Sequence, residues 1–323
     1  MAALELFVVH QGALGDFVAI FPALLRLKRY YNRIEVLCQN QLGILAKELS
    51  IVDRYHPQEG ALAASLFAVQ IEPKMVDLLK SFAAIVLFSN SSQLERTIRR
   101  VTGKPCYRIP PKPPAQKPIH VTEFALNKLV KQGLLSKADL NPLSINDRHP
   151  GEDENHQTRN VKKILLHPGS GSRRKRWPMA LFIKIESMLK SNTLEPEFIV
   201  GPAEQDLVKT LLNPQHPERT VHELIEIVDL LALLKSAGGY IGNDSGVSHL
   251  AAFLGLPTAV IFGPADPRRW QPLGRAVEVV RPLLECQPCF ETQKENCEKP
   301  RCLKDTQSEN VIDAFYRVYK SFA

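Results

Sequence analysis

Residues 239–267, which read GYIGNDSGVSHLAAFLGLPTAVIFGPADP, decide the fold of this chain. The pattern predicts a short strand, a polar turn, a helix and a second apolar strand that ends in a Gly/Pro turn. Ser245 and Gly246 stand where the helix is expected to begin. The first N–H groups of a helix lack partners within the helix and carry partial positive charge, so this turn could bind a phosphate group. The same residues could also do no more than cap and turn a βαβ unit.

Length and composition predict two soluble domains. A chain of 323 residues exceeds one ordinary core and suits two α/β domains of about 150 residues each. Hydrophobic residues make up 44% and charged residues 23%, as in globular proteins. The N-terminus lacks a basic region followed by a long apolar run, and no segment approaches the roughly 20 apolar residues of a membrane span. We therefore expect no signal peptide and no transmembrane helix.

The charge balance indicates an anionic partner. The formal charge is +7 and the pI is near 9.0, which favours nucleic acid, an anionic membrane surface or a phosphorylated substrate. The sequence contains no recognisable helix-turn-helix, zinc finger or aromatic ribonucleoprotein motif, and aromatic residues make up only 7%. We therefore expect no nucleic-acid partner.

Apolar runs alternate with helical patterns in both halves of the chain, which predicts parallel sheets covered on both faces. Five prolines in residues 108–118 predict a stretch without regular structure. The expected strands are residues 6–9, 33–38, 83–88, 163–167 and 197–200. The expected helices are residues 17–31, 41–49, 121–132, 179–189, 203–212, 224–236 and 308–319.

The polar stretch 146–163 is the expected hinge between two doubly wound Rossmann-like domains that face a central cleft. The boundaries we predict are 1–155 for the N-terminal domain and 156–306 for the C-terminal domain. A terminal helix would occupy 307–323, with a return to the N-terminal domain as one option. Ligands are expected outside the carboxyl ends of the strands.

The first expected strand ends in a glycine turn. Gly12 and Gly15 leave room for a close approach of the backbone, and Asp16 stands at the start of the following helix. Asp16 alone is well explained as a helix cap. The functional alternative is a carboxylate that accepts a proton from a hydroxyl in the transition state.

The first strand of the second half ends in a turn of small residues, among them Ser170, and four consecutive cations follow at residues 173–176. A charge run is usually a solvated surface, but one that follows a glycine turn at the carboxyl end of a strand favours a diphosphate site. Glu204 follows the next strand. It could be a helix-start acid, or it could accept the two hydroxyls of a ribose.

Four of the six cysteines, with the spacing C-x2-C-x7-C-x4-C, crowd into one polar loop at Cys286, Cys289, Cys297 and Cys302. Thiolates at this spacing could hold a structural zinc ion. Reduced surface thiols or an occasional disulfide are the alternatives, and we expect no catalytic metal.

Four motifs together carry a resemblance to a known family. They are Gly-Ala-Leu-Gly-Asp-x5-Pro from Gly12, His-Pro-Gly-Ser…Lys-Arg-Trp-Pro from His167, Gly-Pro-x-Glu from Gly201, and Asn-Asp-Ser-Gly-x-x-His-Leu-Ala-Ala…Pro-Thr…Phe-Gly-Pro-x-Asp-Pro from Asn243. In this order they resemble the ADP-heptose:lipopolysaccharide heptosyltransferases, glycosyltransferase family 9, over nearly the whole chain. The four-cysteine loop is similar to one found in many members.

The resemblance implies a GT-B fold, with the acceptor held mainly by the N-terminal domain and ADP-heptose by the C-terminal domain. It implies that Asp16 is the catalytic base beside the acceptor-side loop of Gly12 and Gly15. Lys175 would contact the donor phosphates with the Ser245 and Gly246 turn. The residues expected to bind the nucleotide are Ser170, Glu204 (with Asp206 close by), Asp244 and His249.

The implied reaction is an inverting, metal-independent transfer of heptose from ADP-heptose, or a related nucleotide sugar, to Kdo or heptose of the lipopolysaccharide inner core. No cofactor is expected. The protein would be a cytoplasmic monomer held peripherally at the inner membrane by its basic surface and its lipid-linked acceptor. A nucleotide-sugar epimerase or hydrolase on the same fold, or a non-catalytic nucleotide- or glycan-binding module, are the alternatives.

Two positions depart from the family pattern. Many members carry Arg or Lys where His10 stands, and residues 88–92 lack the Asp expected after that strand. Both lie in the N-terminal half, so the identity of the acceptor is the least determined part of the expectation.

Overall fold

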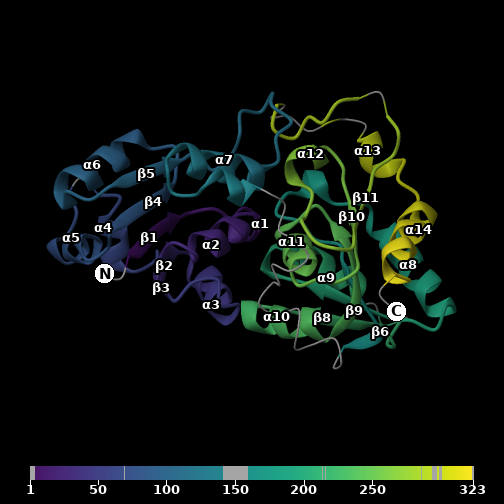
Figure 1. Ribbon diagram of the computed structural model, residues 1–323. Helices are drawn as coiled ribbons and strands as arrows, with labels where there is room; N and C mark the ends of the chain where they lie inside the picture. Colours follow the sequence, from purple (N-terminus) through teal and green to yellow (C-terminus); the bar gives the residue numbers. More distant parts are fainter. Residues whose placement is uncertain are drawn as a thin grey trace. The chain divides into compact units, whose positions relative to one another are not determined.

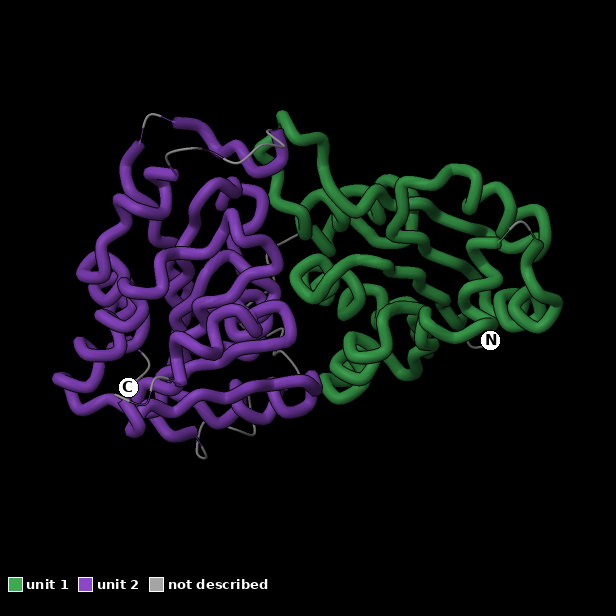
Figure 2. Tube along the Cα trace, turned by 180° about the vertical axis from the view of Figure 1, so that it is seen from behind, with its two compact units in different colours: residues 1–150 green, residues 151–323 purple. Residues whose placement is uncertain are grey.

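The computed structural model describes residues 4–321 except 69, 141–158, 213, 215, 285, 293–296, 298 and 299. The chain divides into two compact units, residues 1–150 and 151–323, and each unit contains its own parallel sheet (Figure 2). The boundary expected at residue 155 and most of the hinge expected at 146–163 lie outside the described residues. No helix in the described part of the chain is long and apolar enough to cross a membrane.

Unit 1 is built on a five-stranded parallel sheet with the strand order β3-β2-β1-β4-β5 (Figure 1). The strands are β1 (Glu5–His10), β2 (Arg33–Cys38), β3 (Arg54–Pro57), β4 (Ala84–Phe88) and β5 (Cys106–Ile109). The helices are α1 (Leu14–Val18), α2 (Phe21–Leu27), α3 (Asn40–Glu48), α4 (Ala61–Ser65), α5 (Pro73–Lys80), α6 (Ser92–Thr102) and α7 (Val121–Lys131), followed by the 3-10 helix η1 (Lys137–Leu140).

The order of the strands in unit 1 reverses at β1, which pairs with β2 on one side and β4 on the other. The chain winds outward in both directions from this point, and such a switch point leaves a crevice at the carboxyl ends of the central strands. The loop that leaves β1 after His10 carries the Gly12–Asp16 turn. The topology therefore places the predicted acceptor-side loop at a ligand-binding position.

Unit 2 is built on a six-stranded parallel sheet with the strand order β11-β10-β9-β6-β7-β8. The strands are β6 (Asn160–His167), β7 (Glu195–Val200), β8 (Thr220–Glu223), β9 (Ala237–Asn243), β10 (Thr258–Ile261) and β11 (Val277–Val280). The helices are α8 (Met179–Ser191), α9 (Gln205–Leu211), α10 (Ile227–Ser236), α11 (Gly246–Phe253), α12 (Pro267–Trp270), α13 (Arg301–Lys304) and α14 (Ser308–Tyr319), with the 3-10 helices η2 (Arg173–Lys175) and η3 (Pro202–Glu204).

The switch point of unit 2 lies between β6 and β9. His167 is paired with Gly242, so the chain leaves both strands at the same level of the sheet. The turn after β6 and the turn after β9 therefore lie beside each other. These are the two turns in which the sequence places its phosphate ligands.

The final helix packs within unit 2. α14 lies against α8, β10 and β11, with the ring of Phe315 fully buried in the core that it shares with Phe182 (Figure 1). A return to the N-terminal unit was one option from the sequence, but the apolar stripe of α14 is already covered here.

Two sequence expectations need correction. The helix expected over 17–31 is two helices, because Pro22 has no N–H to donate to the Val18 carbonyl and its ring clashes with that group, so α1 ends there and α2 begins anew. The stretch expected to lack regular structure from residue 108 begins two residues too early. Arg108 and Ile109 complete β5 before the first proline.

The buried ion pair between Glu186 and Arg219 predicts that unit 2 loses stability in acid. The two side chains are 4% and 3% exposed, with Arg219 Nη2 2.8 Å from Glu186 Oε2. Burial raises the pKa of Glu186, but the hydrogen bonds and charges of Arg219 and Lys190 outweigh it and hold the pKa below its usual range. This stabilisation is present above the unfolded pKa of a glutamate and is lost as the pH falls through the lower folded pKa.

Glu186→Gln is expected to destabilise the protein by about 3 kcal/mol at neutral pH, because it leaves the Arg219 charge buried without a carboxylate. Urea denaturation of the full chain measures this. The matched control is Glu309→Gln, whose ion pair with Lys184 is about half exposed, so its loss should change stability much less than that of the buried pair. Equal effects of the two substitutions would contradict the assignment.

Candidate functional site

The amide of Asn243 joins the two turns at the switch point of unit 2. Its Nδ2 donates to the carbonyls of Pro168 (2.7 Å) and Gly169 (3.3 Å), and its Oδ1 accepts from the Trp177 backbone N–H (3.1 Å). Ser170 Oγ donates to the Asp244 carbonyl at 2.9 Å. Asn243 is fully buried, so these hydrogen bonds fix the two turns relative to each other.

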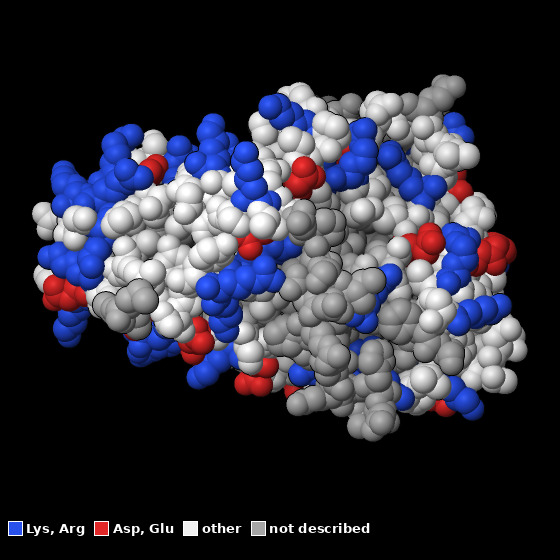
Figure 3. Space-filling view, viewed as in Figure 1, with Lys and Arg blue, Asp and Glu red and all other residues white. Residues whose placement is uncertain are grey.

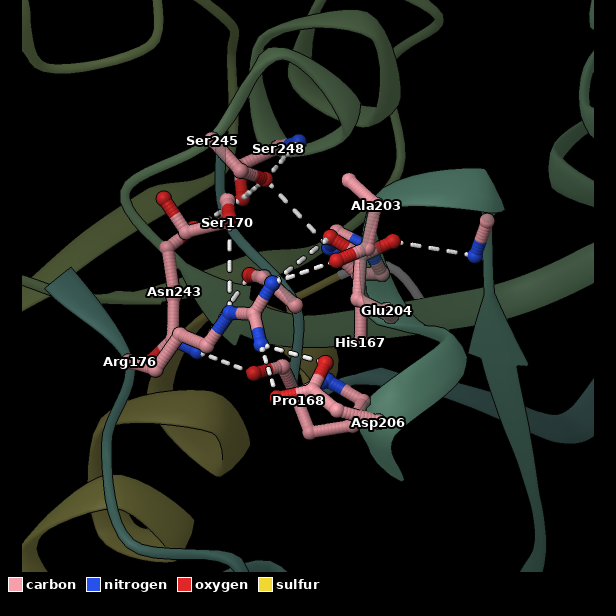
Figure 4. Close-up of polar contacts among 12 residues, drawn as sticks. His167, Pro168, Ser170, Arg176, Ala203, Glu204, Asp206, Asn243, Ser245 and Ser248 are labelled. Carbon is pink, nitrogen blue, oxygen red and sulfur yellow. Dashed lines mark hydrogen bonds and ion pairs between the residues drawn. The ribbon is translucent and has the colours of Figure 1, made fainter. Parts of the chain in front are cut away.

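The beginning of α11 is held by a small hydroxyl network. Ser245 is the N-cap, and its Oγ accepts from the Ser248 backbone N–H at 3.4 Å. Ser248 Oγ donates to the Asn243 carbonyl, and Ser245 Oγ lies 3.3 Å from His167 Nδ1 (Figure 4). Gly246 is the first residue of the helix. The prediction that the helix begins at Ser245 and Gly246 is therefore confirmed.

An ion pair between a partly exposed lysine and a buried aspartate lies directly beside this helix start. Lys175 Nζ is 2.8 Å from Asp244 Oδ2, and the Asp244 side chain is only 4% exposed while that of Lys175 is 18% exposed. Burial raises the pKa of Asp244, the charge of Lys175 opposes this, and Glu291 adds to it; the net direction is upward. The pair places one cation at the edge of the sheet, beside the N-terminus of α11.

Phe290 covers the other side of Lys175, and sequence reasoning missed it. The ammonium nitrogen lies 4.3 Å from the ring centroid, a cation–π distance. Phe290 is fixed because its backbone N–H donates to the Pro264 carbonyl at 3.0 Å and its ring packs on the Val260 cluster. An aromatic residue more than 100 positions from Lys175 gives no sequence signal for this contact.

Glu204 is buried at the same edge of the sheet, at the end of η3. Its Oε2 accepts from the Gly201 N–H at 3.0 Å and lies 3.9 Å from His167 Nε2. Burial raises the pKa of Glu204, but His167, the Gly201 amide and Arg176 outweigh it, so the pKa lies below its usual range and the group is ionised at neutral pH. Gly169 faces this carboxylate, where a Cβ atom would lie 2.4 Å from Glu204 Cδ. Only glycine fits there.

The four cations at residues 173–176 do not act as one patch. Arg176 donates from Nη1 to both Asp206 carboxylate oxygens (2.9 and 3.0 Å) and from Nη2 to the Ala203 carbonyl (2.7 Å). Arg173 Nη2 is 3.2 Å from Asp206 Oδ2. These contacts tie the loop after β6 to the loop after β7 (Figure 4). Asp206 is thus occupied by two arginines, whereas Glu204 is held by the Gly201 amide and lies 3.8 Å from Arg176.

Unit 2 brings all seven predicted donor-side residues to one edge of its sheet. His249 lies one turn inside α11 and is 5% exposed, and Ser170 is 2% exposed. The residues gathered at this edge are Ser170, Lys175, Glu204, Asp244, Ser245, Gly246 and His249.

Asp16 occupies the third position of α1, at the switch point of unit 1. The N-cap is Ala13 rather than Asp16, the residue that the turn alone predicted as the cap; Asp16 Oδ2 instead accepts from the Ala13 N–H at 3.3 Å, and its side chain remains partly exposed. A Cβ atom at Gly12 would lie 2.7 Å from Asp16 Cβ and 2.8 Å from His10 Cε1, so this position requires glycine. Gly15 lies within α1.

The four-cysteine loop lines a cavity of about 1160 Å³ together with Arg173, Arg174, Arg281 and Arg301. All six cysteines of the chain are free thiols. Burial, and then Cys286 and Cys289, raise the pKa of Cys302. Among the residues that the structure describes, no three His, Cys, Asp or Glu side chains converge on a position for a metal ion.

Comparisons with known proteins agree on one family. The family model described as glycosyltransferase family 9 (heptosyltransferase) matches residues 111–299. Lipooligosaccharide heptosyltransferase 2 of Campylobacter jejuni serotype O:2 is 30% identical over 174 residues, which are 50% of this chain and 53% of that protein. The match thus spans about half the length of the curated relative.

Two solved structures share the fold over nearly the whole chain. ADP-heptose lps heptosyltransferase II of E. coli has a TM-score of 0.74 at 16% identity, with 98% of this chain and 99% of that chain covered. E. coli heptosyltransferase WaaC with ADP-2-deoxy-2-fluoro heptose has a TM-score of 0.70 at 16% identity, with 97% and 99% covered. The predicted fold class, two doubly wound Rossmann-like units of the GT-B type, is confirmed.

His10 gives unit 1 a pH dependence of its own. The side chain is 2% exposed, and burial lowers its pKa to about 4, only partly offset by a hydrogen bond with the Asp16 backbone. His10 is therefore neutral at neutral pH and supplies no fixed charge. Because the folded pKa lies below the unfolded value, stability is lost as the pH falls from about 6.5 towards 4.

The loss of unfolding free energy between pH 7 and pH 4 is expected to be smaller in His10→Gln by up to about 3 kcal/mol, because glutamine cannot take up a proton in the unfolded state. Glutamine can still accept the hydrogen bond from the Gly12 N–H. The measurement is the difference in unfolding free energy between wild type and variant at a series of pH values. A difference that stays constant from pH 7 to 4 would rule out the titration of His10.

Proposed function

The chain belongs to glycosyltransferase family 9 (heptosyltransferase), and on this premise we propose that it transfers a heptose from ADP-heptose, or a related nucleotide sugar, to Kdo or heptose in the inner core of lipopolysaccharide. The observation that carries the proposal is the ion pair of Lys175 and Asp244 beside the N-terminus of α11. It puts a cation beside the first N–H groups of a helix, at the sheet edge where doubly wound units bind phosphates.

Unit 2 is the donor side of this proposal. Lys175 and the N–H groups at Ser245 and Gly246 hold the diphosphate. The ionised carboxylate of Glu204 accepts the ribose hydroxyls, as acidic residues do at this level of nucleotide-binding sheets. Ser170, Asp244 and His249 complete the nucleotide site, and their burial supports a role in shaping it rather than in catalysis.

Unit 1 is the acceptor side, and Asp16 supplies the base. The acceptor hydroxyl oxygen attacks the anomeric carbon as its proton passes to the Asp16 carboxylate. The bond from the anomeric carbon to the phosphate oxygen breaks, and its electron pair leaves with ADP. A single displacement inverts the configuration. The growing negative charge on ADP is stabilised by Lys175 and the start of α11, so the step calls for no divalent cation or cofactor.

The setting of the reaction follows from its acceptor. We infer that the protein works as a monomer in the cytoplasm, at the inner membrane, because Kdo-lipid A and the inner core are lipid-linked. The rival activities differ in what they need. An epimerase or hydrolase would consume the nucleotide sugar with no acceptor present, and a binding module would bind ADP without turnover.

The decisive experiment incubates the protein with ADP-heptose and defined truncated lipopolysaccharides and measures product mass. We expect a gain of one heptose on one acceptor. Asp16→Asn should lower turnover by on the order of a hundredfold or more while ADP binding stays nearly unchanged, since asparagine keeps the Ala13 contact but cannot take the proton. The control Asp77→Asn changes an exposed acid of the same unit and should leave turnover within about twofold. Near wild-type turnover in Asp16→Asn would contradict the assignment of Asp16 as the general base.

Lys175→Ala is expected to weaken ADP binding by roughly ten- to a hundredfold, the value of one charge-assisted hydrogen bond to phosphate. Titration calorimetry measures this. The substitution also leaves the Asp244 carboxylate unpaired, so the second variant is Lys175→Ala with Asp244→Asn. Affinity that returns fully in the double variant would mean that Lys175 only neutralises Asp244. Affinity that stays low supports a direct phosphate contact.

A further inference from the structure

The net positive charge of the chain is concentrated in one segment of unit 1. Residues 92–131 contain nine of the 41 Lys and Arg residues but only two of the 34 Asp and Glu residues. The net charge of this segment, +7, equals that of the whole chain, so the remaining residues are balanced. The segment runs from α6 through β5 to the end of α7. Figure 3 shows Lys and Arg gathered over the part of unit 1 where Figure 1 draws α6.

The two faces of α6 are sharply different. Leu94, Ile98 and Thr102 recur every four residues and are buried against unit 1. Arg96 and Arg100, one turn apart, point the opposite way at 3.6 residues per turn, and both are exposed. The apolar face of α6 therefore packs in the core of unit 1. The outward face carries Arg96 and Arg100, and Lys104 follows just after the end of the helix.

Structural contacts use the other arginines of the segment but not this pair. Glu95 is the only acid between residues 92 and 122, and it pairs with Arg99 (3.2 Å) and Arg108 (3.1 Å). Arg99 also donates to the Cys106 carbonyl, and Gln132 Nε2 donates to the Arg108 carbonyl at 3.0 Å. These contacts lock α6, β5 and α7 into one frame. Arg96 donates to Ser92 Oγ at 3.3 Å, and no described carboxylate pairs with Arg96, Arg100 or Lys104.

We propose that this outward face of α6, defined by Arg96, Arg100 and Lys104, is the surface through which the protein lies on an anionic lipid bilayer. The biological setting rests on the proposed function, whose acceptor is lipid-linked, but the contact itself needs neither donor nor acceptor. It is electrostatic, because the apolar face of α6 is buried and has nothing to insert. Each basic residue close to an anionic leaflet strengthens partitioning by about fivefold, so a few uncompensated arginines suffice for reversible binding.

A bilayer fits this face better than nucleic acid does. Residues 92–106 contain no aromatic side chain on which a base could stack, and no motif that reads base edges. Screening by salt applies to either partner, so the salt dependence alone does not separate them.

The test is sedimentation of the full chain with vesicles of phosphatidylcholine, alone or with equimolar phosphatidylglycerol, at rising salt. We expect binding to the anionic vesicles only, weakened by salt. Arg96→Glu with Arg100→Glu should lower the partition coefficient by at least about 25-fold, from loss of two charges. Arg96→Gln with Arg100→Gln, which adds no repulsion and little strain, should lower it nearly as far. Thermal melting confirms that both variants stay folded.

The matched control is Lys162→Glu with Lys209→Glu, which makes the same change of net charge at two exposed lysines of unit 2. It should keep binding within about twofold. Vesicle binding that survives in the α6 variants, or that falls equally in the control, would overturn the proposal. So would retention on duplex DNA at physiological salt that depends on Arg96 and Arg100 in the absence of vesicle binding.

This test separates the surface from the proposed activity. The vesicles contain no saccharide, so a protein without heptosyl transfer would still give the expected result. Displacement from vesicles by a soluble phosphorylated inner-core oligosaccharide would assign the face to the saccharide and overturn the proposal. With such a soluble acceptor, turnover in the α6 variants should match wild type, because neither arginine belongs to the catalytic or nucleotide site.

Discussion

The arrangement of the candidate site in unit 2 depends on the buried side-chain amide of Asn243. Three of its hydrogen bonds cross from the end of β9 to the chain that follows β6, and no solvent competes with them. Parallel strands bring their carboxyl ends to one edge but leave the loops that follow undefined. Asn243 supplies that definition, because it fixes Pro168 and Trp177 on either side of the cationic run. Lys175 then reaches Asp244, the residue next to Asn243 in the chain.

The pair of Lys175 and Asp244 makes physical sense as placement rather than as stabilisation. Burying two charges costs about as much as their attraction returns, so such a pair is a weak source of folding free energy. Its effect is to hold an ammonium group in one position, between a carboxylate and the face of Phe290, at the start of α11. A site that must stabilise charge in a transition state needs groups already oriented before the charge appears. The geometry of unit 2 satisfies this condition at the proposed donor site.

The central strands and the principal turns were predictable, and the edges of both sheets were not. β1, β4 and β10 are continuous apolar runs, because strands covered on both faces have no solvent side. The sequence pattern does not indicate β3, β5, β8 or β11, and each of these is an edge strand. β3 and β8 have no buried position at all, so Arg54–Pro57 and Thr220–Glu223 carry no hydrophobic signal. For the site, local motifs predicted Ser245, Gly246 and Asp16, but the partner of each cation is a long-range contact that no local pattern encodes.

Composition gives the net charge of the chain but not its location. The net charge of +7 and the run of four cations at residues 173–176 lie in different units of the structure. At the proposed donor site three cations, Arg173, Lys175 and Arg176, lie close to three carboxylates, those of Asp206, Glu204 and Asp244, so these charges balance one another. The excess lies in residues 92–131 of the other unit, where Glu95 already serves two arginines. A neutralised site discriminates among anions by geometry, whereas an unbalanced surface attracts any of them at longer range, so one protein can carry both without the surface competing for the donor.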